Sequence, residues 1–305
     1  MRNLPHTPTR PARAGAARPT ARARRRAPAC ALLLAALALA LPSCRRPPGA
    51  AGDPGAGAAG PAATPARDAA AKAPDRGDFK VARGEPAADM SPEERAQAAE
   101  EEKSLEEAAA ELNKRFSLPH DIFVGFAECG EPNGFYDPER KEVTVCYELV
   151  DDLYEAFRAD LKTDEEIDEI VSNAITFIFL HEVGHALVDA YDLPVTGREE
   201  DAVDQLSVLV LADGSDEGDK TVLDAARSFA AETEQELDEM AFADEHSFDR
   251  QRFYNIICLL YGQNGQKFAS LVEDGTLPAE RAGRCAEEYA RADKAWDALL
   301  APYVK

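Results

Sequence analysis

The chain has few histidines, few basic residues and no closely spaced cysteines, and each shortage limits what it can do. Only five histidines occur among 305 residues, and 34 Lys and Arg face 57 Asp and Glu. The resulting formal charge of −23 argues against nucleic acid as a partner, because an acidic surface repels phosphates. No Cys-x-x-Cys pair occurs, which disfavours a zinc site made of cysteines.

The N-terminal 44 residues lack acids altogether and carry eight arginines, followed by an apolar run from Ala29 to Leu41. This order is typical of a secretory signal, and the run is too short to span a membrane as a helix. A disordered, arginine-rich DNA-binding tail is the alternative, but it would leave the apolar run without a role. Leu41-Pro42-Ser43-Cys44 resembles a bacterial lipobox, which implies lipidation of Cys44 and attachment to a membrane surface. Pro42 is unusual there, so plain cleavage and secretion stay open.

Residues 45–88 are rich in Ala, Gly and Pro and predict a disordered tether, because they cannot bury a core. Residues 89–305 are then long enough for one domain with a sizeable core. Loss of residues 1–44 removes eight arginines and no acid, so the formal charge falls from −23 to −31. We therefore expect an exported protein, either periplasmic or at the cell surface, with a strongly acidic domain.

Six cysteines occur, and two of them lie within the predicted signal. The other four are Cys129, Cys146, Cys258 and Cys285. An even number in an exported domain indicates disulfides. Among three connectivities we favour the local one, Cys129–Cys146 and Cys258–Cys285. The first would tie a hairpin, and the second would tie two C-terminal helices.

The pattern His-Glu-x-x-His begins at His181, directly after an apolar run that carries no charge from Val171 to Leu180. Residues four apart share one face of a helix, so His181 and His185 can present both imidazoles to one metal ion. Glu182 lies about 100° round the helix, where its carboxylate can take a proton from metal-bound water. Such a helix is mostly buried, which argues against two plain surface histidines. The pattern is typical of zinc hydrolases, and Gly184 indicates close packing.

A catalytic zinc site usually has a third protein ligand, and an acidic run begins the next predicted helix. The candidates are Glu199, Glu200, Asp201 and Asp204. We favour Glu200 as the ligand, because Asp204 lies four residues on and can accept the free N–H of a ligand histidine. Asp201 and Asp204 remain alternative ligands, and Glu199 and Asp201 suit a role at the helix N-terminus alone. Asp189 either supports the ligands from behind or is an exposed helical acid.

The remaining pattern predicts an α+β fold that is mainly helical, with a small hairpin or sheet beside the metal-binding helix. Residues 121–128 and 143–147 read as strands, with turn residues at 132–134 and 137–138 between them. Such a hairpin would offer an edge strand to an extended substrate. Helices are expected from Ser91 to about Arg115 and at 148–161, 165–191 with a Thr163/Glu166 capping box, 198–212, 221–238, 247–262 and 279–300.

The motif His181–Asp189 is similar to the active-site helix of thermolysin-like gluzincins, and Glu200-x-x-x-Asp204 matches their second motif helix. With Gly197–Gln205, the chain resembles a bacterial family of metallopeptidases that is defined largely by sequence. The resemblance covers about Phe116 to the C-terminus, including 133–137, 146–149, 244–246 and 251–255. It implies a zincin-like domain, zinc held by His181, His185 and Glu200, and a peptide or protein substrate.

His246 is a further candidate, because it stands just before an apolar helix and could stabilise the oxyanion formed when water attacks a carbonyl. Arg252 and Tyr254 are alternatives for that task, and a plain helix-capping segment is the simpler interpretation. The leading hypothesis is a zinc metallopeptidase with Glu182 as general base. A non-catalytic zinc-binding lipoprotein or scaffold is the main alternative. A zinc hydrolase acting on a non-peptide amide is another.

Overall fold

The computed structural model describes residues 72–82, 92–158, 163–231 and 242–305. The predicted signal, Cys44 and most of the predicted tether lie outside these residues. Within them the chain is mainly helical with one small sheet, which confirms the predicted α+β class. The strands are β1 (Phe79–Val81), β2 (Ile122–Ala127), β3 (Gly134–Asp137) and β4 (Glu142–Cys146). The helices are α1 (Pro92–Arg115), α2 (Tyr147–Phe157), α3 (Asp164–Tyr191), α4 (Glu199–Leu211), α5 (Asp216–Ala231), α7 (Asp249–Gln263), α8 (Ser270–Glu273) and α9 (Ala279–Leu300).

The sheet has the strand order β1-β2-β4-β3, with β1, β2 and β4 parallel and β3 antiparallel to β4. The two predicted strands are therefore neighbours, but the hairpin expected between them is wrong. The hairpin is formed by β3 and β4, and β3 is a four-residue strand that overlaps both predicted turns, at Gly134 and at Asp137. Sequence reasoning missed β3 because turn residues flank it so closely. Its position leaves β3 as one edge of the sheet.

The predicted tether ends earlier than expected, because residues 72–82 pack against the domain. Phe79 is 2% exposed, and β1 pairs with β2 from Phe79 to Val81. The side-chain oxygen of Asn113 in α1 accepts a hydrogen bond from the amide of Phe79, and its side-chain nitrogen donates one to the Phe79 carbonyl. These two hydrogen bonds hold β1 against α1. The composition of the segment is misleading here, since a single buried aromatic residue and one strand's hydrogen bonds are enough to order it.

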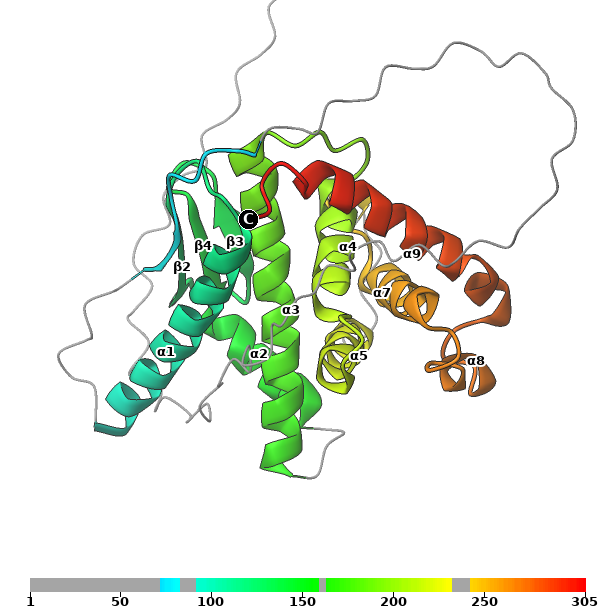
Figure 1. The fold of residues 1–305 in the computed structure, drawn as a ribbon. Helices are drawn as coiled ribbons and strands as arrows, with labels where there is room; N and C mark the ends of the chain where they lie inside the picture. Colours follow the sequence, from blue (N-terminus) through cyan, green and yellow to red (C-terminus); the bar gives the residue numbers. More distant parts are fainter. Residues whose placement is uncertain (1–71, 83–91, 159–162, 232–241) are drawn as a thin grey trace, which may run out of the picture.

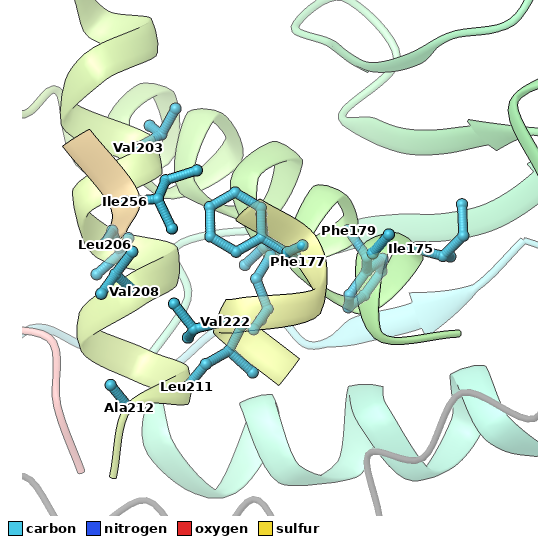
Figure 2. Packing of buried hydrophobic residues seen from close by; sticks show 14 of the residues in the cluster. Ile175, Phe177, Phe179, Val203, Leu206, Val208, Leu211, Ala212, Val222 and Ile256 are labelled. Carbon is cyan, nitrogen blue, oxygen red and sulfur yellow. The ribbon is translucent and has the colours of Figure 1, made fainter. Parts of the chain in front are cut away.

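Helix α3 runs through the middle of the molecule, with the sheet and α1 on one side and α4, α5, α7 and α9 on the other (Figure 1). It begins with the predicted capping box of Thr163 and Glu166. Nearly all of its residues from Ile167 to Val188 are buried, as expected for a helix apolar on every face. By length and composition α3 could cross a membrane, but its apolar side chains are buried in the fold. The core gathers Phe177, Val203 and Ile256 between α3, α4 and α7 (Figure 2).

Two disulfides are present, in the predicted pairing. Cys129–Cys146 joins the segment after β2 to the end of β4, and Cys258–Cys285 joins α7 to α9. The bridged residues are 17 and 27 positions apart, so each bond removes about 3 kcal/mol of unfolded-chain entropy in the simple loop model. Such bonds are consistent with an oxidising compartment outside the cytoplasm.

Candidate metal centre

The centre forms where the second half of α3 meets the N-terminal turn of α4. His181 is 3% exposed and lies one helical turn before His185, so both imidazoles point from one face of α3. The helices approach closely because Gly184, between the histidines, has no side chain. A Cβ at Gly184 would lie 2.8 Å from the Cβ of Val203 in α4. The close packing predicted for Gly184 is therefore present.

Three donor atoms converge at this point. Nε2 of His181 lies 3.0 Å from Oε2 of Glu200, and Nε2 of His185 lies 3.3 Å from the same oxygen. The two Nε2 atoms are 3.3 Å apart. Among the candidate acids, Glu200 is thus the one whose carboxylate meets both histidines.

Each of the two histidines also forms a hydrogen bond to a carboxylate through Nδ1, the ring nitrogen that faces away from the centre. Nδ1 of His181 lies 2.8 Å from Oδ1 of Asp204, and Nδ1 of His185 lies 2.7 Å from Oε1 of Glu199. A carboxylate there holds a proton on Nδ1 and leaves the Nε2 lone pair directed at the centre. Asp204 occupies the place that the spacing predicted for it. Glu199 was one of the candidate acids and also suited a role at the helix N-terminus alone; its contact with Nδ1 of His185 was not predicted.

The donor set fits a divalent metal ion. Two ligands about 2.0–2.1 Å from a tetrahedral zinc lie about 3.3–3.4 Å apart, close to the separations observed here. Without a cation, the Nε2 lone pairs of His181 and His185 would face each other and a carboxylate oxygen.

Partial burial disfavours ionised Glu200, but hydrogen bonds from the histidines outweigh it and hold its pKa far below the usual value. Burial likewise opposes charge on His185, yet hydrogen bonds to Glu200 and Glu199 raise its pKa to about 9. The centre therefore favours positive charge, supplied by protons or by a metal ion.

Glu182 lies beside the donors and is 6% exposed. Among the described residues, no group donates a hydrogen bond to its carboxylate. Burial raises its pKa, which keeps the group available to take up a proton. Gly134 of β3 packs against it, since a Cβ at that position would lie 3.7 Å from Cγ and Oε1 of Glu182. The buried carboxylate thus sits between the metal-binding helix and the edge strand.

The segment before α7 brings His246 to the centre. Nε2 of His246 lies 3.1 Å from Oε2 of Glu200, and Nδ1 lies 3.0 Å from Oδ1 of Asp244. The hydrogen bond to Glu200, only partly opposed by burial, raises the pKa of His246 to about 9. Arg198 of the α3–α4 connection donates to the carbonyls of Glu245 and His246, which holds the segment in place.

The alternatives to His246 are placed differently. Arg252 donates twice to Asp204, at 2.8 and 2.9 Å, and is therefore occupied in the wall of the site. Tyr254 packs edge-on against Phe253. Sequence reasoning missed the pairing of Arg252 with Asp204 because the two residues are 48 positions apart and no spacing rule links them. Asp201, another alternative ligand, accepts a hydrogen bond from Ser247 at 2.7 Å.

Asp189 does not support the ligands. Its carboxylate accepts hydrogen bonds from the hydroxyl of Tyr136 at 2.6 Å and from Nζ of Lys141 at 2.7 Å. Partial burial would raise the pKa of Asp189, but these two hydrogen bonds outweigh it and hold the pKa below its usual value. Asp189 therefore joins α3 to the β3–β4 hairpin and does not hydrogen-bond to a ligand histidine, as its spacing had suggested it could.

The sequence model of a family described as "Putative metallopeptidase" matches residues 85–300, well over half of the chain. The chain belongs to this family. Membership implies a metal ion and a peptide or protein substrate. No curated protein and no solved structure matches the chain.

Proposed function

We propose that this family member is a zinc-dependent peptidase in which His181, His185 and Glu200 hold the metal. The observation that carries the proposal is the convergence of three donor atoms beside the buried carboxylate of Glu182. A purely structural zinc site has no use for such a carboxylate, whereas hydrolysis requires a base. When bound there, zinc would polarise a substrate carbonyl and lower the pKa of an attacking water.

The side chains of this chain carry the proton transfers. Glu182 takes the proton from the attacking water and delivers it to the leaving amine, a task that suits a carboxyl whose pKa is raised by burial. His246 donates a hydrogen bond to the oxyanion that develops on the carbonyl, with Asp244 orienting its ring. Asp204 and Glu199 keep the protons of the ligand histidines on Nδ1.

The edge strand positions the substrate. Among the described strands β3 ends the sheet order, and an extended peptide running past Glu182 would pair with its outer edge. Such pairing uses only backbone groups of the substrate, which is why it favours a peptide over a small amide. The binding of an extended chain also leaves side-chain selectivity to neighbouring surfaces.

The test is the Glu182→Gln variant of the full-length protein, assayed on a defined peptide library with and without a chelator. We expect unchanged zinc content and loss of hydrolysis by about 10²–10⁴-fold, because the amide keeps the shape but cannot accept a proton. Glu169→Gln, an exposed change earlier on α3, is the control and should cleave normally. Undiminished zinc-dependent turnover by the Glu182 variant would rule the mechanism out.

One contact favours a second candidate, a non-catalytic zinc protein. Nε2 of His246 lies near the same oxygen of Glu200 as the ligand histidines do, so it could close a fourth ligand position. X-ray absorption of zinc-loaded wild type and of His246→Ala separates the two functions. Loss of one nitrogen ligand in the variant would favour the closed site, whereas an unchanged number would favour the peptidase.

We further propose that the protein is exported and anchored through a lipid on Cys44. The two disulfides support export, and the residues around Cys44 carry the inference of the anchor. Cys44→Ser should release the protein from the membrane fraction while the rest of the chain still leaves the cytoplasm. If the wild type is recovered in soluble form with an unmodified N-terminus, plain signal cleavage replaces the anchor.

A further inference from the structure

The β3–β4 hairpin is fastened to the metal-binding helix one turn beyond the last metal ligand on that helix. Asp189 lies one helical turn beyond His185. Its carboxylate accepts hydrogen bonds from the hydroxyl of Tyr136 in β3 and from the ammonium group of Lys141 in the hairpin turn. The side chains of Lys141 and Asp189 are 34% and 35% exposed. We call these three residues, Tyr136, Lys141 and Asp189, the clasp.

Lys141 adopts a backbone conformation that does not suit lysine. Its φ is 55°, in the left-handed region, which costs a residue with a side chain roughly 1–2 kcal/mol. Asp137 shapes the turn by accepting hydrogen bonds from the amides of Glu139 and Arg140. A glycine would satisfy the same backbone without strain. The lysine side chain is the part that glycine could not replace, and it reaches Asp189.

A second contact lies further back along α3. Gly134, two residues before Tyr136 on β3, packs against Ile178 and Glu182, where an added Cβ would lie 2.9 Å from Cγ2 of Ile178. Glu182 and Asp189 are seven residues apart, about 10 Å along the helix. Two contacts at that separation determine both the distance and the direction of β3 relative to α3.

We propose that Tyr136, Lys141 and Asp189 are positioning residues that hold the edge strand in register with Glu182 for an extended peptide. The inference rests on the proposed function, because it assumes that substrate pairs with β3. None of the three side chains touches a metal ligand. Their effect is exerted through the placement of β3, so they act on the binding of substrate rather than on the proton transfers.

The experiment compares Asp189→Asn, Lys141→Gly and Lys141→Arg with wild type in the full-length, zinc-loaded protein. The probe is a quenched fluorescent peptide selected from the library as a wild-type substrate. For Asp189→Asn and Lys141→Gly we expect KM to rise about fivefold and kcat to stay within twofold of wild type. This corresponds to the loss of about one hydrogen bond between β3 and the substrate, equally in the ground state and the transition state. Lys141→Arg should have the wild-type KM, because arginine can still pair with Asp189. Lys141→Gly should have a Tm close to that of wild type, because glycine also relieves the strained backbone.

The matched control is Lys80→Met, which breaks an ion pair with Asp121 at the opposite edge of the sheet. That pair is similarly exposed, at 48% and 37%, so a general loss of stability would affect both kinds of variant alike. An unchanged KM for Asp189→Asn and Lys141→Gly would overturn the proposal. So would a KM that rises equally in Lys80→Met.

Hydrogen exchange of the β3 amides separates this inference from the proposed function. Asp189→Asn and Lys141→Gly should exchange these amides at least several-fold faster than wild type, while Lys141→Arg and Lys80→Met should not. If wild type cleaves no peptide, the proposed peptidase function is wrong. If the β3 amides of Asp189→Asn and Lys141→Gly exchange at the wild-type rate, the clasp does not hold β3, whatever the outcome of the peptidase assay.

Discussion

Gly184 of α3 and Val203 of α4 are in such close contact that any side chain at position 184 would overlap the valine: a Cβ there would lie 2.8 Å from Cβ and 2.9 Å from Cγ1 of Val203. Gly184 lies between the two ligand histidines, and Val203 lies about one turn after Glu200, next to Asp204. The distance between the two helices therefore sets the distance between His185 and Glu200.

Gly184→Ala should separate the helices and weaken zinc binding. In an exposed helix this change stabilises by up to about 1 kcal/mol, but here overpacking should destabilise by about 1–3 kcal/mol. The measurements are urea unfolding and zinc affinity by chelator competition. Gly283→Ala in α9 is the matched control, because nothing lies within 4 Å of its added Cβ. A Gly184 variant as stable as the Gly283 variant would show that the contact is tolerant.

Asp204→Asn should lower zinc affinity by about 10–100-fold, because the amide no longer fixes the proton on Nδ1 of His181. It should also destabilise the fold by several kcal/mol, since Arg252 is left buried without its partner charge. The double variant Asp204→Asn/Arg252→Met distinguishes these effects. We expect it to regain stability but not zinc affinity, as measured by unfolding and metal competition. Recovery of both would show that Asp204 acts on the metal only through the fold.

The clasp should contribute stability that depends on pH. The pKa of Asp189 is lowered in the folded protein, so its contribution is fully present above the unfolded value of about 3.9 and is lost as pH falls through the folded value. Lys141 and Tyr136 donate hydrogen bonds to the carboxylate, and the charge of His120 also lowers its pKa. The difference in unfolding free energy between wild type and Asp189→Asn should be at most about 1 kcal/mol at pH 6, because the pair is a third exposed, and should shrink toward pH 3. A difference that grows on acidification would contradict this sign.

The disulfides predict a simple thiol count. Protein unfolded without reductant should show no free thiol from Cys129, Cys146, Cys258 or Cys285. Replacing Cys258 and Cys285 by alanine should cost about 2–4 kcal/mol of unfolding free energy with unchanged zinc affinity, because that bond joins α7 to α9 away from the metal ligands. Four titratable thiols would show that neither bond forms.

Much of the secondary structure was predictable because it depends on local signals. The capping box of Thr163, the uncharged run of α3 and the proline that begins α1 each act within a few residues. The short strands were harder. β1 has three residues and pairs with β2, which lies about 40 positions further along the chain. β3 has four residues, and two of them, Gly134 and Asp137, are of the types that indicate turns.

By itself, the sequence determined that His181, Glu182 and His185 share a helix and that Glu200 and Asp204 share another, since helical spacing is a local property. Only the tertiary structure decided which partners those faces meet. It places Glu199 behind His185, gives Arg252 to Asp204, and turns Asp189 toward Tyr136 and Lys141 instead of the metal ligands. These contacts depend on how closely α3, α4 and the sheet pack. That closeness is set by steric fit between surfaces distant in sequence, such as Gly184 against Val203, which no spacing rule records.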